Sequence, residues 1–201
     1  MSEVSPGGRF LVLVTGYAAA GKTTIAPLLA EELEALWISR DRIHEMVYSG
    51  WEPAHPALTS DSYDPRVGDS VFLEGSVVWN IFLWMLHRTT HHTPVVADTP
   101  FNHDWNRRMF AAVATEIEVP MVEVALHGDP DVLLRRARLR AASGRVHEIT
   151  AKFSTNDASY YAPPYRPVLA EDQVIRVDTT DLEAVNVPEI AEQVRAGIRR
   201  K

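Results

Sequence analysis

One short segment constrains the fold of this chain more than any other. Residues 16–23 carry glycine, four intervening residues, glycine, lysine and threonine in that order. This is the spacing of a loop whose backbone N–H groups surround the phosphates of a nucleotide. A continuous apolar run, residues 10–15, precedes the loop, and a helical pattern follows it over about residues 22–35. We therefore expect a buried strand, a phosphate-binding loop and a helix in immediate succession.

Each residue type in this loop has a physical reason to be there. Glycine lets the backbone curl so that its N–H groups face the phosphates, and the helix N-terminus adds a positive dipole end. Lysine is expected to reach the β- and γ-phosphates, and the threonine hydroxyl to ligate Mg²⁺. The predicted ligands are ATP and Mg²⁺. The predicted binding residues are Gly16, Ala18, Ala19, Ala20, Gly21, Lys22, Thr23 and Thr24. A turn that merely joined a strand to a helix would need no lysine followed by threonine.

Apolar runs alternate with helical patterns along the rest of the chain. Further strands are expected at residues 36–39, 94–98, 121–126 and 173–177, and further helices at 41–48, 70–92, 103–116, 130–142 and 188–199. Five strands alternating with helices indicate a doubly wound α/β fold in three layers. We find no repeat or linker in the sequence, so we expect one domain over residues 1–201.

Composition disfavours several classes of protein. The chain has 201 residues, no cysteine and a formal net charge of -7. The acidic balance disfavours a general nucleic-acid binder. Without cysteine or a pattern typical of a signal peptide, a cytoplasmic protein is the simplest expectation. The most apolar run, residues 77–86, is shorter than the roughly 20 residues that span a bilayer. We interpret it as a buried helix and expect no membrane partner.

Two sequence features favour a phosphotransferase over a switch or motor. The tetrapeptide Asn-Lys-x-Asp that recognises guanine is absent, and the strand ending at Asp98 carries a single carboxylate instead of an acidic pair. Asp41 follows the second strand, at the carboxyl edge where such sheets bind ligands. A carboxylate there can accept a proton from an attacking hydroxyl. The alternative is that Asp41 caps the helix that follows.

A run of arginines predicts a lid over the phosphates, at about residues 135–155. Between Asp131 and Glu148 the chain has no acidic residue and carries Arg135, Arg136, Arg138, Arg140 and Arg145. Like charges at helical spacing repel one another, and a triphosphate would supply the missing counter-charge. The predicted catalytic arginines are Arg138 and Arg145, then Arg140. The alternative is a solvated basic face.

The order of these motifs resembles that of the small P-loop kinases. The P-loop, the strand-end Asp41, the Val-Val-Ala-Asp-Thr strand end and the arginine-rich segment are similar to those of one AAA-type group of ATP-binding kinases. That group holds polynucleotide 5'-hydroxyl kinases, chloramphenicol phosphotransferases and zeta toxins. The resemblance covers residues 9–177 and implies strand order 2-3-1-4-5, helices on both faces and a lid. It also implies that Asp41 is the general base.

The resemblance further suggests where the acceptor binds. Residues 96–102 are similar to the polynucleotide kinase segment whose aspartate contacts the acceptor, so Asp98 is a candidate for substrate or Mg²⁺ contact. Capping of a turn or helix is the alternative. Residues 49–69 lack periodicity, contain three prolines and form the predicted acceptor loop. The predicted acceptor residues are Asp98, Arg42, His44, Asn102, Tyr63 and Arg66.

These observations predict an ATP- and Mg²⁺-dependent phosphotransferase acting on a hydroxyl group. A small acceptor such as a nucleoside, sugar or antibiotic is favoured by the acidic charge. It is also favoured by His44, which stands where polynucleotide kinases carry the arginine that meets the acceptor phosphate. A polynucleotide 5'-hydroxyl is the second candidate, and a nucleotide-binding switch or ATPase the third.

Two groups of side chains leave alternatives open. His87 and His91 stand four residues apart near a helix end and could bind a metal, but no third ligand is evident from the sequence. Tyr160, Tyr161 and Tyr165 could stack on a flat acceptor or pack beneath the loops that carry them.

Overall fold

A computed structural model of the chain describes residues 8–51, 68–101, 103–142 and 157–200. Within these ranges it describes all side chains except those of residues 47–51 and 68–76.

The core of the fold is a parallel sheet of five strands in the order β2-β3-β1-β4-β5. The strands are β1 Leu11–Gly16, β2 Leu36–Ser39, β3 Val95–Asp98, β4 Met121–His127 and β5 Val174–Asp178. Every residue of β1 is buried because helices cover both faces of this central strand. The predicted three-layer P-loop fold and its strand order are confirmed.

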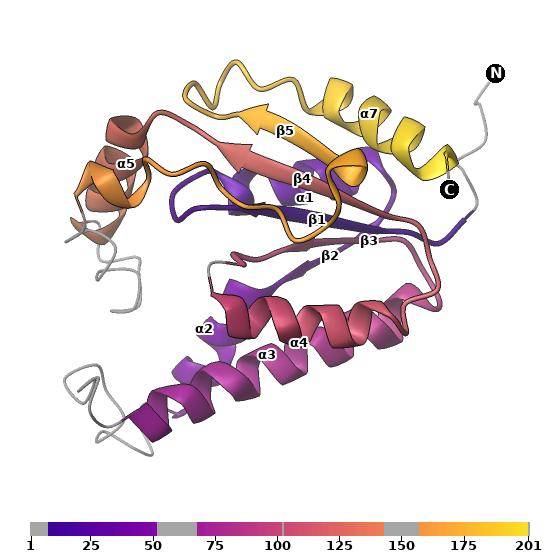
Figure 1. Cartoon of the computed structure of the whole chain (residues 1–201), viewed down its shortest axis with the longest axis horizontal. Coiled ribbons are helices and arrows are strands. Elements are labelled where there is room, and N and C mark those ends of the chain that lie inside the picture. Colours follow the sequence, from indigo (N-terminus) through magenta and orange to yellow (C-terminus); the bar gives the residue numbers. More distant parts are fainter. Residues whose placement is uncertain (1–7, 52–67, 102, 143–156, 201) are drawn as a thin grey trace.

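Helices form the two outer layers (Figure 1). They are α1 Lys22–Glu32, α2 Arg40–Trp51, α3 Gly68–Thr90, α4 Asp104–Ala114, α5 Pro130–Ala142 and α7 Val187–Arg199, with short 3-10 turns η3 Ala158–Tyr160 and η4 Glu171–Gln173. Alternate side chains of β1 enter opposite layers, as the pleat requires. Val12 and Val14 join the core beneath α1 and α7, whereas Leu11 and Leu13 join the core beneath α3 and α4.

Strand register brings three chain segments to one edge of the sheet. Asp98 at the end of β3 pairs with Val14 of β1 on one side and with Ser39 of β2 on the other. The P-loop leaves β1 from this edge, and α2 begins directly after Ser39. The strand ends that carry the predicted catalytic residues therefore meet in one row.

The helix predicted to be buried at residues 77–86 is exposed along one side. In α3 the side chains of Val78, Phe82 and Leu86 are completely buried. The exposed fractions on the other side are Val77 44%, Ile81 37% and Trp84 64%. The run is apolar all round, but α3 is an outer-layer helix and only one face meets the core. Among the helices of the described residues, none combines the length and apolar character needed to cross a membrane.

Candidate nucleotide and acceptor site

The P-loop takes a backbone path that only glycine fits at two positions. Gly16 has a φ of +140° and Gly21 a φ of +89°, both in the region that side chains disfavour. A Cβ atom on Gly16 would lie 2.5 Å from the Leu126 carbonyl oxygen, and one on Gly21 would lie 2.6 Å from a Leu182 methyl carbon. The clash at Gly16 is with backbone, so packing as well as conformation requires glycine there, whereas at Gly21 the Leu182 side chain could shift and the positive φ is the stronger reason.

Helix α1 begins at the P-loop with its N-terminus open to an anion. Gly21 is the N-cap residue, no side chain caps this end, and the first turn carries no acidic residue. The first N–H groups of a helix have no intrahelical acceptor, and the helix dipole adds positive potential there. This cradle, with positive φ at both glycines and no room for a Cβ at Gly16, fits the phosphates of a nucleotide.

Lys22 lies at the centre of the site, where it is only 7% exposed. Its Nζ donates to the carbonyl oxygens of Gly16 at 3.1 Å and Tyr17 at 2.8 Å. Burial lowers the pKa of Lys22, while the carboxylates of Asp41 and Asp98 act in the opposite direction and the Arg140 guanidinium lowers it further. Three predicted site residues from β3, α2 and α5 therefore lie within electrostatic range of Lys22.

Asp98 is fully buried and held by two side chains of β2. The indole N–H of Trp37 donates to its Oδ2 at 2.6 Å, and the Ser39 hydroxyl donates to its Oδ1 at 3.2 Å. Burial raises the pKa of Asp98 to about 6, although both hydrogen bonds and nearby Lys22 favour the ionised form. The predicted alternative, that Asp98 caps a helix or turn, finds no support in these contacts.

This raised pKa predicts a pH dependence of stability that Asp98→Asn should remove. A folded-state pKa above the unfolded value of 3.8 means that the protonated carboxyl favours folding. The contribution is complete below about pH 4 and is lost as pH rises through about 6, amounting to about 3 kcal/mol at most. Denaturant unfolding at several pH values should show the wild type losing stability over this window relative to Asp98→Asn. Parallel curves would contradict the prediction.

Asp41 lies in the first turn of α2, and its side chain is 38% exposed. Its nearest charged partner is Arg40, whose guanidinium lies 3.2 Å from Oδ1. The capping alternative is disfavoured because the Ser39 hydroxyl already accepts from the backbone N–H of Arg42, at 3.4 Å. The Asp41 carboxylate is thus left partly exposed, within electrostatic range of Lys22.

The arginine-rich segment has a helical first half with different contacts for its members. Asp129 caps α5, since its carboxylate accepts from the backbone N–H groups of Asp131 and Val132. Arg136 donates to the carbonyl oxygens of Thr179 at 2.7 Å and Thr180 at 2.9 Å, and so ties α5 to the segment after β5. The exposed arginines of this helix are Arg135, Arg138 and Arg140, whereas Arg145 lies outside the described residues.

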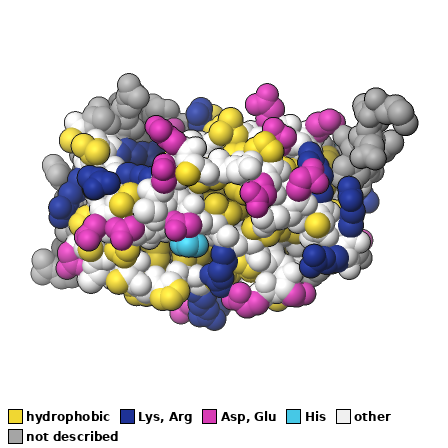
Figure 2. Space-filling view, turned by 90° about the horizontal axis from the view of Figure 1, so that it is seen from above, with side chains coloured by type: hydrophobic (Ala, Val, Ile, Leu, Met, Phe, Trp, Pro, Cys, Tyr) yellow, Lys and Arg dark blue, Asp and Glu magenta, His cyan; other side chains and the backbone are white. Residues whose placement is uncertain are grey.

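Charged side chains of both signs lie on the surface of the molecule. Figure 2 shows basic and acidic side chains interspersed over the face seen from above, with Lys and Arg at both ends of the molecule, including the end where Figure 1 places α5. On this face, the basic side chains therefore do not form one continuous patch.

The predicted acceptor residues are only partly described. Arg42 lies with its guanidinium carbon 5.2 Å from the centre of the Trp37 ring, and His44 is buried. Asn102, Tyr63 and Arg66 lie outside the described residues, as does most of the predicted acceptor loop at 49–69. Their part in acceptor binding stays a prediction.

The sequence that builds this site matches a known family. Residues 11–163 match the profile of a family described as an AAA domain. The chain belongs to this AAA domain family. The match includes the P-loop, both strand-end carboxylates and α5. Among curated proteins, none matches the sequence.

Solved structures show the same fold over nearly the whole AAA domain chain. A candidate kinase from Chloroflexus aurantiacus j-10-fl aligns with a TM-score of 0.69 and 21% identity, covering 96% of this chain and 97% of that one. The Mycobacterium tuberculosis APS kinase, in complex with AMPPNP and APS, gives 0.57 and 16%, covering 96% and 99%. A gluconokinase from Sinorhizobium meliloti 1021 gives 0.51 and 20%, covering 98% and 94%. This AAA domain therefore has the fold of P-loop kinases.

Tyr17, the second residue of the P-loop, joins the loop to residues 160–165, which follow the predicted lid. Its ring meets those of Tyr160, Tyr161 and Tyr165 at centroid distances of 5.5, 5.8 and 5.6 Å, and its hydroxyl donates to the Pro163 carbonyl oxygen at 3.1 Å. Tyr161 and Tyr165 are buried. Tyr161 and Tyr165 therefore pack in the interior, which is one of the two roles considered; the other was stacking on a flat acceptor.

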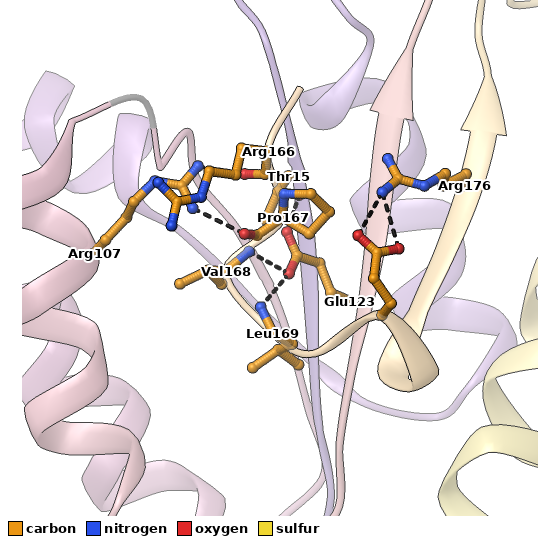
Figure 3. Close-up of polar contacts among 9 residues, drawn as sticks. Thr15, Arg107, Glu123, Arg166, Pro167, Val168, Leu169 and Arg176 are labelled. Carbon is orange, nitrogen blue, oxygen red and sulfur yellow. Dashed lines mark hydrogen bonds and ion pairs between the residues drawn. The ribbon is translucent and has the colours of Figure 1, made fainter. Parts of the chain in front are cut away.

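A buried carboxylate on β4 that the sequence analysis did not single out ties down the same segment (Figure 3). Glu123 is fully buried and accepts from the Thr15 hydroxyl at 2.6 Å and from the backbone N–H groups of Val168 at 2.7 Å and Leu169 at 2.8 Å. Burial raises the pKa of Glu123, against which these hydrogen bonds and the Arg107 charge act. Arg107 itself donates to the carbonyl oxygens of residues 166 and 167.

The two histidines considered as metal ligands lie at the C-terminal end of α3, His87 within the helix and His91 just after it. His87 and His91 approach with their Nε2 atoms 3.4 Å apart, and Glu116 lies 3.6 Å from His87. Within the described part of the chain, no group of three or more histidine or acidic side chains is arranged to hold a metal ion.

Proposed function

We propose that this chain transfers the γ-phosphate of ATP to a hydroxyl group of a small molecule, with Mg²⁺ as the metal. The observation that carries the proposal is the common row of strand ends. The P-loop leaves β1 at the edge where Asp98 ends β3 and where α2, with Asp41, leaves β2. A phosphate-binding loop and two carboxylates at one sheet edge provide both a donor and an acceptor side.

In this proposal each side chain has one task. Lys22 and the loop N–H groups hold the phosphates, and Asp41 accepts the proton of the attacking hydroxyl. Asp98 orients the acceptor. Arg138, Arg140 and Arg145 neutralise charge on the transferring group and exclude water when the lid closes.

The donor atoms at this edge also suit Mg²⁺, which prefers oxygen ligands. The Thr23 hydroxyl, which follows Lys22 directly in α1, is the predicted direct ligand. Both oxygens of Asp98 already accept hydrogen bonds, so Asp98 suits an indirect contact better than a direct one. When bound, the metal would supply charge neutralisation on the phosphates.

Comparison with other proteins supports a small acceptor. The structurally similar proteins include a gluconokinase and an APS kinase, whose names denote small substrates. A net charge of -7 and His44 in place of an arginine also favour a small molecule over a polynucleotide end.

The test is a panel of hydroxyl acceptors incubated with the purified chain, ATP and Mg²⁺. The panel holds nucleosides, neutral sugars, sugar acids, amphenicol and other hydroxylated antibiotics, and a 5'-hydroxyl oligonucleotide, with Lys22→Met as the blank. A kinase should form ADP and phosphorylated acceptor in equal amounts, and only with the right compound. ADP released at the same rate with every compound would instead favour an ATPase or switch.

A further inference from the structure

Trp37, on β2, contacts two of the predicted acceptor residues at once. Its indole N–H donates to Asp98 at 2.6 Å. Its ring face lies under the guanidinium of Arg42, 5.2 Å from centroid to carbon, which is the geometry of a cation–π contact. One side chain therefore joins the end of β3 to the first turns of α2, across 61 residues of sequence in the case of Asp98.

Ser39 repeats this connection two residues further along β2. Residues two apart in a strand point to the same side, so Trp37 and Ser39 both reach Asp98. The Ser39 hydroxyl donates to the second carboxylate oxygen and accepts from the Arg42 backbone N–H. Each oxygen of Asp98 thus has its own donor, and both donors come from β2.

These two hydrogen bonds determine how the Asp98 carboxylate is turned. The terminal torsion of aspartate has a broad, soft profile, so the side chain alone does not fix the plane of its oxygens. Asp98 is fully buried, which leaves no bulk water to replace a lost donor. The 2.6 Å bond from Trp37 is the shorter of the two and involves a rigid ring.

We infer that Trp37 is a positioning residue of the acceptor side, which orients Asp98 through its indole N–H and holds Arg42 against its ring. This inference rests on the proposed function, because it assigns Asp98 and Arg42 to acceptor binding. It adds a residue that acts through Asp98 and Arg42.

Two substitutions separate the contacts of Trp37. Trp37→Phe keeps an aromatic face for Arg42 but loses the N–H, and we expect it to lower kcat/KM for the acceptor about tenfold, with KM for ATP unchanged. Trp37→Leu loses both contacts and should lower kcat/KM for the acceptor about threefold further. Trp84→Phe, at a tryptophan 64% exposed on α3, is the matched control and should behave as wild type.

A double-mutant comparison distinguishes positioning from general loss of structure. In an Asp98→Ala background, Trp37→Phe should cause less than a twofold further loss, because its hydrogen-bond partner is gone. An undiminished tenfold loss there, or a Trp37→Phe variant with wild-type kinetics, would overturn the inference.

A measurement that needs no turnover covers the case in which these variants fold poorly. In the ¹H–¹⁵N spectrum, Asp98→Asn should shift one indole resonance, that of Trp37, and leave the other tryptophan signals near their wild-type positions. Unmoved indole signals would contradict the hydrogen bond itself. A wild-type chain without turnover on any acceptor would contradict the proposed function, and the indole shift would then test the Trp37 contact alone.

Discussion

Replacement of Asp41 by asparagine is expected to lower kcat by about 10²- to 10⁴-fold while leaving ATP affinity within about twofold. Asparagine has the same shape and keeps α2 intact, but its amide cannot take a proton from the acceptor hydroxyl. The side chain is 38% exposed and its charge acts on Lys22, so a proton acceptor lies within electrostatic range of the phosphate loop. Acceptor-dependent ADP formation measures kcat, and titration with a non-hydrolysable ATP analogue measures affinity.

The matched control for this variant is Asp104→Asn. Asp104 is the acidic residue in the first turn of α4, as Asp41 is in α2, so both substitutions remove one favourable charge from a helix N-terminus. If helix stability alone explained the effect, the two variants would lose similar activity. We expect Asp104→Asn to retain wild-type turnover within about twofold. Wild-type turnover in Asp41→Asn would exclude Asp41 as the base.

Local patterns predicted most of the fold because their causes are local. The glycine spacing of the P-loop, the apolar runs of the strands and the periodic patterns of the helices all depend on neighbours within a few residues. Strand order is different in kind, since it depends on which strands pair, and it came from the resemblance to P-loop kinases. The structure confirms it.

Contacts between distant segments could not be predicted in the same way. Trp37 meets Asp98 across 61 residues, and Tyr17 meets Pro163 across 146. Each pairing depends on strand register and on how a loop returns to the sheet, and neither is encoded in a short window. One signal was present at Glu123, since a carboxylate inside the apolar run of a central strand must find buried donors. Only the structure identifies those donors, which are Thr15, Val168 and Leu169.

Truncation of Glu123 to alanine is expected to destabilise the chain by about 3 kcal/mol or more. The substitution leaves the partly buried N–H groups of Val168 and Leu169 without their acceptor, and each orphaned donor costs about 1–3 kcal/mol. Glutamine can still accept from these N–H groups, so Glu123→Gln should lose only about 1 kcal/mol. Denaturant unfolding near neutral pH measures both differences, and a loss below about 1 kcal/mol in Glu123→Ala would contradict the role of this carboxylate.

The exposed ion pair of Glu171 and Arg176 provides the control. Figure 3 labels Arg176 of this pair. Glu171 accepts two hydrogen bonds from Arg176, at 2.8 and 3.0 Å, yet its side chain is 73% exposed. Water replaces these bonds when they are lost, so Glu171→Ala should cost at most about 1 kcal/mol. Glu123 accepts three hydrogen bonds and Glu171 two, at similar lengths, but Glu123 is fully buried and Glu171 is exposed. A larger effect at Glu171 than at Glu123 would therefore contradict the argument that desolvation decides the cost.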